Sequence, residues 1–412
     1  MQEQFGEKIP FCEPYWYQGG HSPYYTENHK KYRALVRDFV EREVKPNVDK
    51  WLKTGYPKEL HQKSCELGVE SVVYPREFGG KMPQDYDPFY EMILYDEVAR
   101  VGGGMVLGHI MINGLGLPPI IAAGTPELKK RVLPDVVAGK KFVCLAITEP
   151  TAGSDVAGIR ATARREGDFY IVSGVKKWIT GGAYSDFFTT AVRTGGEGMG
   201  GISLLVLEKD MPGITIRKME TQFDTSHNTT FITLEDVKVP VANLLGKENQ
   251  GFKLIMANFN HERFIIAAET CRKARICYEE SIKYALQRRT FGKRLVEHQI
   301  IRYKLAEMAR LIEALYDNLE RVGFQFKSNV PDAKLGGQCA LLKVNASRTF
   351  EFCAREAAQI FGGNSIVKEG KGKIIERLYR EVRGSAIPGG SEEILLDFVI
   401  RQAATEATKS KL

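Results

Sequence analysis

The chain has 412 residues, a length that favours two or three domains over a single hydrophobic core. With 43% hydrophobic and 26% charged residues, its composition is that of an ordinary soluble globular protein. The 58 basic and 51 acidic residues are interleaved and leave a net charge of only +7. This balance does not support nucleic-acid binding, whereas a modest positive surplus suits a polyphosphorylated ligand.

The seven cysteines and seven histidines are scattered along the chain, with no C-x-x-C pair and no other metal-binding spacing. An odd number of dispersed cysteines indicates free thiols in a reducing compartment. We therefore expect neither a structural nor a catalytic metal.

The two ends of the chain bear on its location. The first residues include Glu3, Glu7 and Glu13 but no arginine before Arg33, so we expect neither a secretory signal nor a mitochondrial transit peptide. The last three residues, Ser410-Lys411-Leu412, match the peroxisomal import signal, although a polar tail also carries such a tripeptide by chance. We expect a peroxisomal protein if the source is a eukaryote.

The longest run without Lys, Arg, Asp or Glu covers residues 101–126 and is interrupted by glycine, asparagine and proline. A buried helix and loop explains this run better than a membrane span, and we expect no membrane span.

The first third of the chain has the periodicity of helices. Apolar residues at spacings of three and four follow Thr26, a candidate N-cap, and Pro46 should stop this helix. A second helix is expected over 58–67 and a third, amphipathic one over 87–102. Three consecutive glycines, 102–104, cost helix stability, so they mark a break or a close approach of a ligand to the backbone.

From about residue 142 the pattern becomes one of strands. They are expected at 143–148, 168–174, 186–194, 202–209, 213–219 and 229–240. The second strand should end in a turn at Gly174. Gly196, Gly198 and Gly201 spell G-x-G-x-x-G, but they lead into a strand and open no helix, so we interpret them as a loop. The segment predicts a β-barrel or sandwich and not a Rossmann domain.

After about residue 249 long helices return, at 252–287, around 305–315, and at 333–359 and 392–404. Long helices with apolar stripes predict a four-helix bundle. The expected fold class is α+β and multidomain. It comprises an N-terminal helical domain (1–141), a central β domain (142–248) and a C-terminal four-helix bundle with a terminal tail (249–412).

One stretch, 145–180, carries the strongest chemical signal. It opens with LAITEPTAGSD (145–155) and closes with KKWIT (176–180). Short hydroxyls on a kinked backbone beside Trp178 suit a flat, hydrogen-bonding heterocycle with phosphates attached. A β-turn between two core strands explains the same residues equally well on chemistry alone.

Both blocks of this stretch resemble the flavin-contacting segment of the acyl-CoA dehydrogenase family. Further family blocks follow in the family's order: VKVPVANLLG (237–246), QRRTFGKRLVEHQ (287–299), QIFGGN (359–364) and PGGSEEIL (388–395). The resemblance covers nearly the whole chain. It implies the family's fold, FAD as cofactor, and dehydrogenation of an acyl-CoA to the 2-enoyl-CoA. In that reaction a carboxylate takes the α-proton and a hydride passes from the β-carbon to flavin N5.

The resemblance also implies site residues, position by position. Contacts with FAD are expected from Leu145, Ile147, Thr148, Ser154, Trp178 and Thr180, and Ser154 would also contact the substrate. Contacts with FAD across a subunit interface are expected from Arg288, Phe291 and Gln299. Further cofactor contacts are expected from Gln359, Gly362, Gly363, Ser391 and Glu393. The alternative for Arg288 is a solvated charge on a helix surface.

The expected base departs from the commonest family pattern. Many members carry the catalytic glutamate where this chain has Gly389. Isovaleryl-CoA and long-chain acyl-CoA dehydrogenases have glycine there and supply the carboxylate from the long helix, directly before an arginine. Glu262 stands directly before Arg263, so we expect Glu262 to be the base and Arg263 to contact substrate. Gly389 would donate its backbone N–H to the thioester oxygen.

Alternatives remain at the base. Spacing alone makes Glu262 a surface residue paired with a lysine or arginine. Glu392 and Glu393 are rival bases, although their position suits charges at a helix N-terminus better.

Alternatives also remain for the function. The chain could be an acyl-CoA oxidase that passes electrons to oxygen, or a non-catalytic acyl-CoA or flavin binder. The electron acceptor, oxygen or an electron-transfer protein, stays open. The family resemblance implies a homotetramer. Gly102–Gly104, Met105 and Leu107 are our candidates for setting the acyl-chain length.

Overall fold

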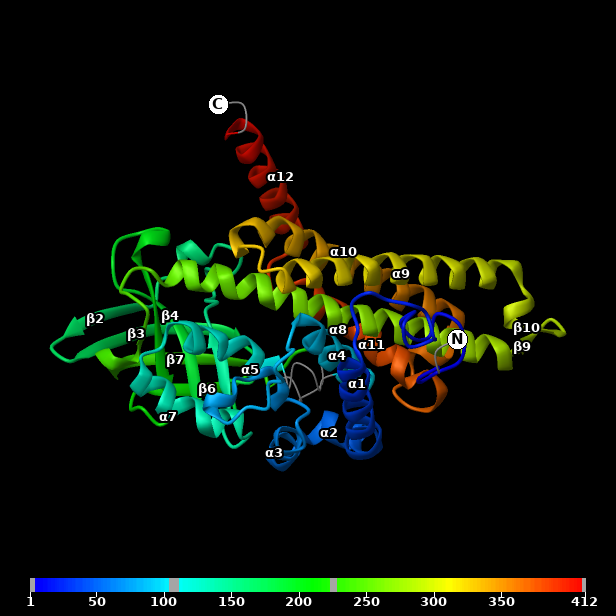
Figure 1. Ribbon diagram of the computed structural model, residues 1–412, viewed down its shortest axis with the longest axis horizontal. Coiled ribbons are helices and arrows are strands. Elements are labelled where there is room, and N and C mark those ends of the chain that lie inside the picture. Colours follow the sequence, from blue (N-terminus) through cyan, green and yellow to red (C-terminus); the bar gives the residue numbers. More distant parts are fainter. Residues whose placement is uncertain (1–3, 104–110, 223–227, 410–412) are drawn as a thin grey trace. The chain divides into compact units, whose positions relative to one another are not determined.

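A computed structural model of the chain describes residues 4–103, 111–222 and 228–409 (Figure 1). The chain forms two compact units, each discontinuous in sequence. The first contains the described residues of Met1–Val40, Asp87–Gly103 and Arg263–Leu412, and the second those of Glu41–Tyr86 and Gly104–Glu262. Helix α8, Gly251–Gln287, begins in the second unit and ends in the first.

The first unit is helical. Its helices are α1 (Glu27–Phe39), α4 (Pro88–Ala99), the later part of α8, α9 (Gln299–Lys327), α10 (Asp332–Phe361), α11 (Lys373–Ala386) and α12 (Glu392–Lys409). Thr26 is the N-cap of α1, as predicted. Pro46 does not end α1, because the helix ends at Phe39 and a π turn, Val40–Val44, precedes the 3₁₀ turn that contains the proline.

The bundle differs from the prediction in its fourth helix. One hydrophobic cluster joins α8, α9, α10 and α11 through buried side chains such as Cys277, Ile312, Phe350 and Leu378. Helix α11 was not predicted, although Ile375, Leu378 and Val382 have the spacing of an apolar helix face. The predicted helix at 392–404 is α12, which packs on α10 through Leu395 and extends beyond it (Figure 1).

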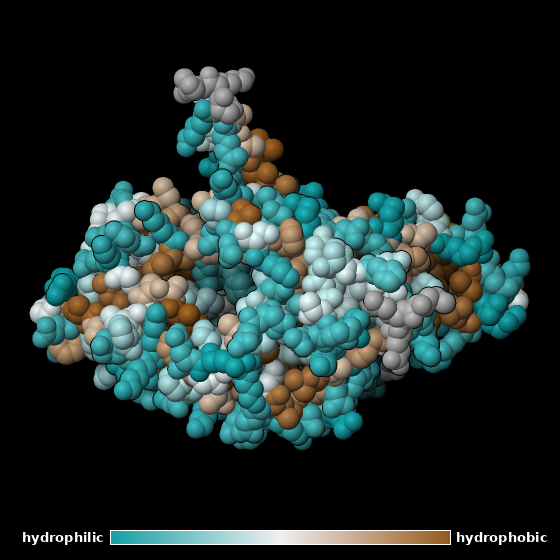
Figure 2. Space-filling model, viewed as in Figure 1, coloured by the Kyte–Doolittle hydropathy of each residue, from teal (hydrophilic) through white to brown (hydrophobic). Residues whose placement is uncertain are grey.

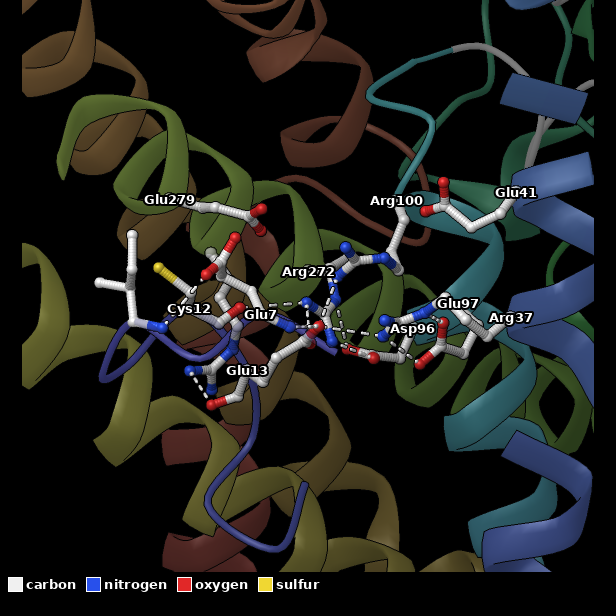
Figure 3. Close-up of polar contacts among 12 residues, drawn as sticks. Glu7, Cys12, Glu13, Arg37, Glu41, Asp96, Glu97, Arg100, Arg272 and Glu279 are labelled. Atoms are coloured by element: carbon white, nitrogen blue, oxygen red, sulfur yellow. Dashed lines mark hydrogen bonds and ion pairs between the residues drawn. The ribbon is translucent and has the colours of Figure 1, made fainter. Parts of the chain in front are cut away.

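Helix α4 lies at the centre of the first unit and is buried on almost every side, so the predicted amphipathic stripe is wrong. Its Asp96 pairs with Arg272 of α8, whose side chain is fully buried. A second oxygen partner, Glu13 Oε2, lies 2.9 Å from Arg272 Nη1. Glu13 also binds Arg37 and Arg100, each at 3.0 Å (Figure 3). This network joins the segment before α1 to three helices.

The second unit contains short helices and a sheet. The helices are α2 (Val48–Thr54), α3 (Lys58–Leu67), α5 (Met111–Gly116), α6 (Pro118–Ala123), α7 (Pro126–Val137) and the start of α8. Helix α3 has the predicted bounds and ends at Gly68, whose φ of 88° favours glycine.

The strands are β1 (Val143–Ala146), β2 (Thr162–Glu166), β3 (Phe169–Ile179), β4 (Phe187–Arg193), β5 (Ile202–Glu208), β6 (Ile214–Lys218), β7 (Thr230–Pro240) and β8 (Leu244–Leu245). The sheet order is β6-β7-β3-β2-β4-β5-β8, and β1 pairs with β4 in parallel. Among the described strands β6 and β8 stay at opposite ends, so the sheet is not closed and "barrel" was too strong a prediction. Both faces are buried: Leu204 and Val206 of β5 pack with α6 and α7, whereas Leu205 and Leu207 pack on the other side.

Strand β3 corrects a second prediction. It does not end at Gly174 but continues to Ile179, with register shifts against β7 between Val172 and Gly174 and between Lys176 and Ile179. Gly174 has a φ of 145°, and a Cβ there would lie 2.6 Å from Ala161 Cα. The glycine therefore marks a bulge rather than a turn. Strands β2 and β8 were not predicted.

Three smaller predictions can be compared with the structure. All seven cysteines are free, as predicted, and all are buried. The glycines at 196, 198 and 201 lie in the loop between β4 and β5. No helix within the described residues has the length and apolarity to cross a membrane.

The Arg272 network yields a stability prediction. Arg272→Met leaves the carboxylates of Asp96 and Glu13 buried without their main partner, so we expect a loss of about 3–5 kcal/mol and a thermal midpoint several degrees lower. Arg310→Met is the control, because Arg310 pairs with Glu307 on the exposed face of α9. Equal midpoints in scanning calorimetry for the two variants would refute the central role of the network.

Candidate active site

The two sequence blocks of the 145–180 stretch lie side by side. The Lys177 backbone N–H donates to the Thr148 carbonyl at 2.8 Å, and Lys176 Nζ donates to the Ile147 carbonyl at 2.9 Å. Each carbonyl therefore already has one protein donor, and the Thr148 hydroxyl is available as a further ligand contact.

A buried ion pair stabilises the contact between the two sequence blocks. Lys176 Nζ lies 2.8 Å from Glu149 Oε1, and both side chains are almost completely buried. The Glu149 carboxylate also accepts from the backbone N–H groups of Arg160 and Ala161 at 2.6 and 2.9 Å. Burial lowers the pKa of Lys176 to about 8, although Glu149 opposes this shift. The pair fixes the loop without using any of its outward-facing groups.

The outward-facing groups suit a flat ring. Trp178 has a φ of 63°, a strained value for a bulky residue, and its side chain is 53% exposed. The hydroxyls of Thr148, Ser154 and Thr180 accept or donate no hydrogen bond within the described part of the chain. Strained presentation of an aromatic plane beside unused hydroxyls fits a planar heterocycle that carries a polar chain.

In the first unit, a β-hairpin follows α8. Its strands are β9 (Arg289–Thr290) and β10 (Lys293–Arg294), and Phe291 and Gly292 form the two-residue turn with φ values of 49° and 76°. Phe291 is 95% exposed at the tip. Arg288 and Gln299 are also exposed, one at the end of α8 and the other at the start of α9. The predicted cross-subunit residues therefore point away from their own chain's core.

The QIFGGN block lies against the end of α8. Tyr284 stacks on Phe361 with ring centroids 4.2 Å apart and accepts from Asn364 Nδ2 at 3.0 Å. A Cβ at Gly362 or Gly363 would meet no described atom within 4 Å. Gln359 is exposed. The space beside these glycines is open, as a predicted cofactor contact requires.

Glu262 is buried, so the surface alternative is wrong. Its side chain is 5% exposed, and Oε1 accepts from Asn258 Nδ2 at 2.6 Å. The next residue, Arg263, is 8% exposed and donates from Nε to the Gly389 carbonyl at 3.0 Å. The described contact of Arg263 is thus with the PGG turn, and its predicted contact with substrate stays a prediction.

The PGG turn is held by a second cation. Lys343 of α10 donates to the carbonyls of Ala386 and of Gly390, the latter at 2.8 Å, and burial lowers the pKa of Lys343 to about 8. Gly389 and Gly390 have φ values of 71° and 107°. A Cβ at Gly389 would come within 3.2 Å of Ile266 Cδ1. The positive φ and this close contact explain why the turn has glycine at 389.

The rival bases belong to the start of α12. Glu392 accepts from Ser347 Oγ at 2.6 Å and from Arg348 Nε at 3.0 Å. Burial raises the pKa of Glu392, but Ser347 and Arg348 together bring it below its usual value. Glu393 is exposed in the first turn of α12, and Ser391 directly precedes the first residue of this helix. Both glutamates are placed as charges at a helix N-terminus.

Only part of the segment that we expect to set the acyl-chain length lies within the described residues. Gly104, Met105 and Leu107 lie outside the described residues. At Gly103 a Cβ would lie 2.6 Å from Arg377 Cδ and 2.7 Å from Glu381 Oε1. The close neighbours of this glycine are therefore side chains of α11, which supports the helix-break explanation.

One group of metal-ligand residue types, His61, Cys65 and Glu70, occurs among the described residues. Asn113 Oδ1 accepts from the Val143 N–H at 2.9 Å, so its Nδ2 faces His61 Nε2 at 3.0 Å as a donor. His61 Nδ1 lies 2.8 Å from Glu70 Oε2. Both ring nitrogens of His61 therefore face protein groups.

Sequence reasoning missed Asn258, Glu149, Lys176 and Lys343 as site residues. Lys176, Glu149 and Lys343 have partners that are distant in sequence, so only the rule that a buried charge needs a partner pointed to them. Asn258 stands four residues before Glu262, a helical spacing that the sequence analysis did not use. Glu262 and Arg263 were candidates because they are adjacent within a family block.

Comparison with known proteins defines the class. Family models described as acyl-CoA dehydrogenase N-terminal, middle and C-terminal domains match residues 26–140, 144–237 and 249–404. The acyl-CoA dehydrogenase apdG of Emericella nidulans is 39% identical over 416 residues, covering 96% of this chain and 95% of its own.

Solved structures agree. A probable acyl CoA dehydrogenase from Mycobacterium abscessus matches with a TM-score of 0.87 and 35% identity over 92% of this chain and all of its own. An acyl-CoA dehydrogenase from Bacillus anthracis, solved as a complex with FAD, has a TM-score of 0.87 and 28% identity and covers 95% of this chain and 69% of its own.

These matches define a flavin-dependent oxidoreductase with an N-terminal helical domain, a middle β-sheet domain and a C-terminal helical domain. The chain belongs to the acyl-CoA dehydrogenase family, whose cofactor is FAD, and the resemblance drawn from the sequence is confirmed. Trp178 and the unused hydroxyls of Thr148, Ser154 and Thr180 fit this cofactor.

The Lys176–Glu149 pair yields a second prediction. Lys176→Met leaves Glu149 without a cation and the Ile147 carbonyl without its donor, so we expect FAD to be retained at least about 10-fold more weakly. The pKa of Lys176 is lower in the folded chain, so the unfolded chain binds more protons between about pH 8 and 10.5. Stability should therefore rise with pH across this window, and the variant should lose part of that rise.

Flavin content after gel filtration and thermal melts between pH 7 and 10 test this. Lys238→Met is the control, because Lys238 lies on the neighbouring strand β7 and is exposed. Equal flavin content in the two variants would count against a holding role for Lys176.

Proposed function

We propose that this chain dehydrogenates an acyl-CoA thioester to the 2-enoyl-CoA with Glu262 as the base. The observation that carries the proposal is the burial of Glu262 on α8, next to the arginine that binds the Gly389 turn. Gly389 has no side chain to ionise, and Glu392 is engaged by Ser347 and Arg348. Glu262 is therefore the carboxylate best suited to the role.

Each residue has one task in this scheme. The Glu262 carboxylate takes the α-proton of the thioester, and the Gly389 N–H donates to the thioester oxygen, where negative charge develops. Arg263 and Lys343 hold the turn that presents this N–H. FAD, when bound, would supply the two-electron chemistry as the hydride acceptor. Trp178 and the hydroxyls of Thr148 and Thr180 orient the ring.

The base assignment gives a kinetic prediction. Glu262→Gln removes the proton acceptor and keeps its size, so we expect anaerobic flavin reduction by acyl-CoA to slow by about 10²–10⁴-fold or more while acyl-CoA and FAD still bind. Glu307→Gln is the matched control, because Glu307 pairs with Arg310 on the exposed face of α9, and it should reduce flavin at the wild-type rate. Near-normal bleaching at 450 nm in Glu262→Gln would remove Glu262 from the mechanism.

The electron acceptor divides the main proposal from an acyl-CoA oxidase. We propose dehydrogenase chemistry, with re-oxidation by an electron-transfer protein or another acceptor. Hydrogen peroxide formed stoichiometrically with enoyl-CoA in air would favour the oxidase. A preparation that binds acyl-CoA without bleaching under anaerobic conditions would favour a mere binder.

We also propose a homotetramer in which the Phe291 hairpin contacts the FAD of another subunit. The exposed Phe291 and the apolar residues Ile394 and Ile400 on the exposed length of α12 support this (Figure 2). Phe291→Ala should lower flavin occupancy and weaken assembly, because it removes a large apolar contact at the tip of the hairpin. Light scattering with flavin quantification tests this, and a monomer with full FAD occupancy would contradict it.

For location, we propose that Ser410–Leu412 act as a peroxisomal address where they end the native protein. These residues lie outside the described part of the structure. An N-terminally tagged chain should lose punctate localisation when they are deleted, and unchanged puncta would refute the proposal.

A further inference from the structure

Asn258 stands one helical turn before Glu262 on α8, and both side chains are buried. Its Nδ2 donates to Glu262 Oε1 at 2.6 Å and to the Leu115 carbonyl at 3.0 Å. A primary amide has two N–H bonds, so it can serve these two acceptors at once.

The orientation of the Asn258 amide is decided by its partners. Turned by 180°, its Oδ1 would face a carbonyl oxygen and a carboxylate, which would repel it. With Nδ2 toward both acceptors, Oδ1 is buried and accepts no hydrogen bond within the described residues. A buried acceptor without a protein partner is unusual in a packed interior and is expected beside a ligand site.

The Leu115 carbonyl is a fixed point. Two residues before it, Asn113 Oδ1 accepts from the Val143 N–H of β1 at 2.9 Å. One residue after it, the Gly116 carbonyl accepts from Thr189 Oγ1 of β4 at 2.7 Å. A Cβ at Gly116 would lie 2.6 Å from the Val143 carbonyl, so α5 is pressed against β1. Asn258 therefore links Glu262 to the sheet.

We propose that Asn258 is a positioning residue that holds one oxygen of Glu262 against the sheet and so aims the carboxylate at the α-carbon. This inference rests on the proposed role of Glu262 as base. Strand β1 contains the start of the Leu145–Thr148 block, so Glu262 and the expected flavin contacts share one anchor. A loose Glu262 would lose part of its rate through misorientation alone.

The hydrogen bond also favours the ionised form of Glu262, which is the form that acts as base. The titratable groups beside it on α8 are His261 and Arg263, and from α5 it is approached by the neutral Leu115–Asn258 link. Removing the donor should therefore shift the base's titration to higher pH and lower the rate at its maximum.

The test is the pH dependence of anaerobic flavin reduction in the holoenzyme at saturating acyl-CoA. The probe is the fastest of butyryl-CoA, octanoyl-CoA and isovaleryl-CoA. In Asn258→Leu, which has a similar volume and no donor, we expect the rising limb to move up by about one pH unit and the maximum to fall about 10-fold or more. Asn258→Asp keeps the shape and adds a negative charge, so its shift should be larger.

Asn243→Leu is the matched control. Asn243 is fully buried in the same unit and bonds the Val206 carbonyl at 2.7 Å and Arg131 at 2.6 Å, away from Glu262. It should lower the melting temperature without moving the pH profile. FAD content and acyl-CoA dissociation constants, measured by calorimetric titration, should stay within about twofold of wild type in Asn258→Leu and Asn258→Asp.

The outcomes distinguish the positioning role of Asn258 from the role of Glu262 as base. A slow Glu262→Gln with an unshifted profile in both Asn258 variants would overturn the positioning role and leave the base assignment intact. The same shift in Asn243→Leu would also overturn it, because a structural defect would then explain the change. A Glu262→Gln variant with near-normal reduction would overturn both proposals.

Discussion

Arg272 has a fully buried guanidinium in the middle of α8. The packing of the first unit depends on the carboxylates that neutralise this charge. An unpaired buried charge would cost several kcal/mol, so the side chain is tolerable only because Asp96 and Glu13 reach it from two other segments. Arg272, Arg100 and Arg37 hold the pKa of Glu13 at about 2, against the effect of burial. Because the three segments must meet at one point, the network specifies how α4, α8 and the residues before α1 pack, which apolar contacts alone leave degenerate.

Buried lysines play a comparable part beneath the functional loops. Lys176 holds the Ile147–Glu149 loop, and Lys343 holds the Ala386–Gly390 turn. A loop that must present N–H groups and hydroxyls to a ligand cannot bury them against apolar side chains. A buried cation that donates to the carbonyls of the loop stabilises the loop and leaves its N–H groups and hydroxyls free. Burial brings the pKa of both lysines to about 8, which is the electrostatic cost of this arrangement.

Much of the fold was predictable because its elements are long and periodic, as in α8, α9, α10 and strands β4 and β5. The misses have physical causes. Strand β2, TARRE, has one buried residue and is recognised only by its pairing with β3. The bulge at Gly174 resembles a turn because both use glycine at positive φ. For the candidate site, the family blocks drew attention to Glu262, Arg263 and Gly389, whose roles stay predictions. They did not locate Asn258, because its role depends on Leu115, which is 143 positions away.

In the proposed mechanism, the glycine at 389 and the glutamate at 262 depend on each other. The turn has a φ of 71° at Gly389, and a side chain there would press on Ile266, so this turn cannot carry a glutamate without strain. The proposed mechanism therefore takes the carboxylate from a helix, where the backbone is rigid but a glutamate side chain has three rotatable bonds. A base in the PGG turn would be aimed by the turn itself. A base on α8 needs a second group to fix its rotamer, and Asn258, tied to the sheet through Leu115, is placed to do so.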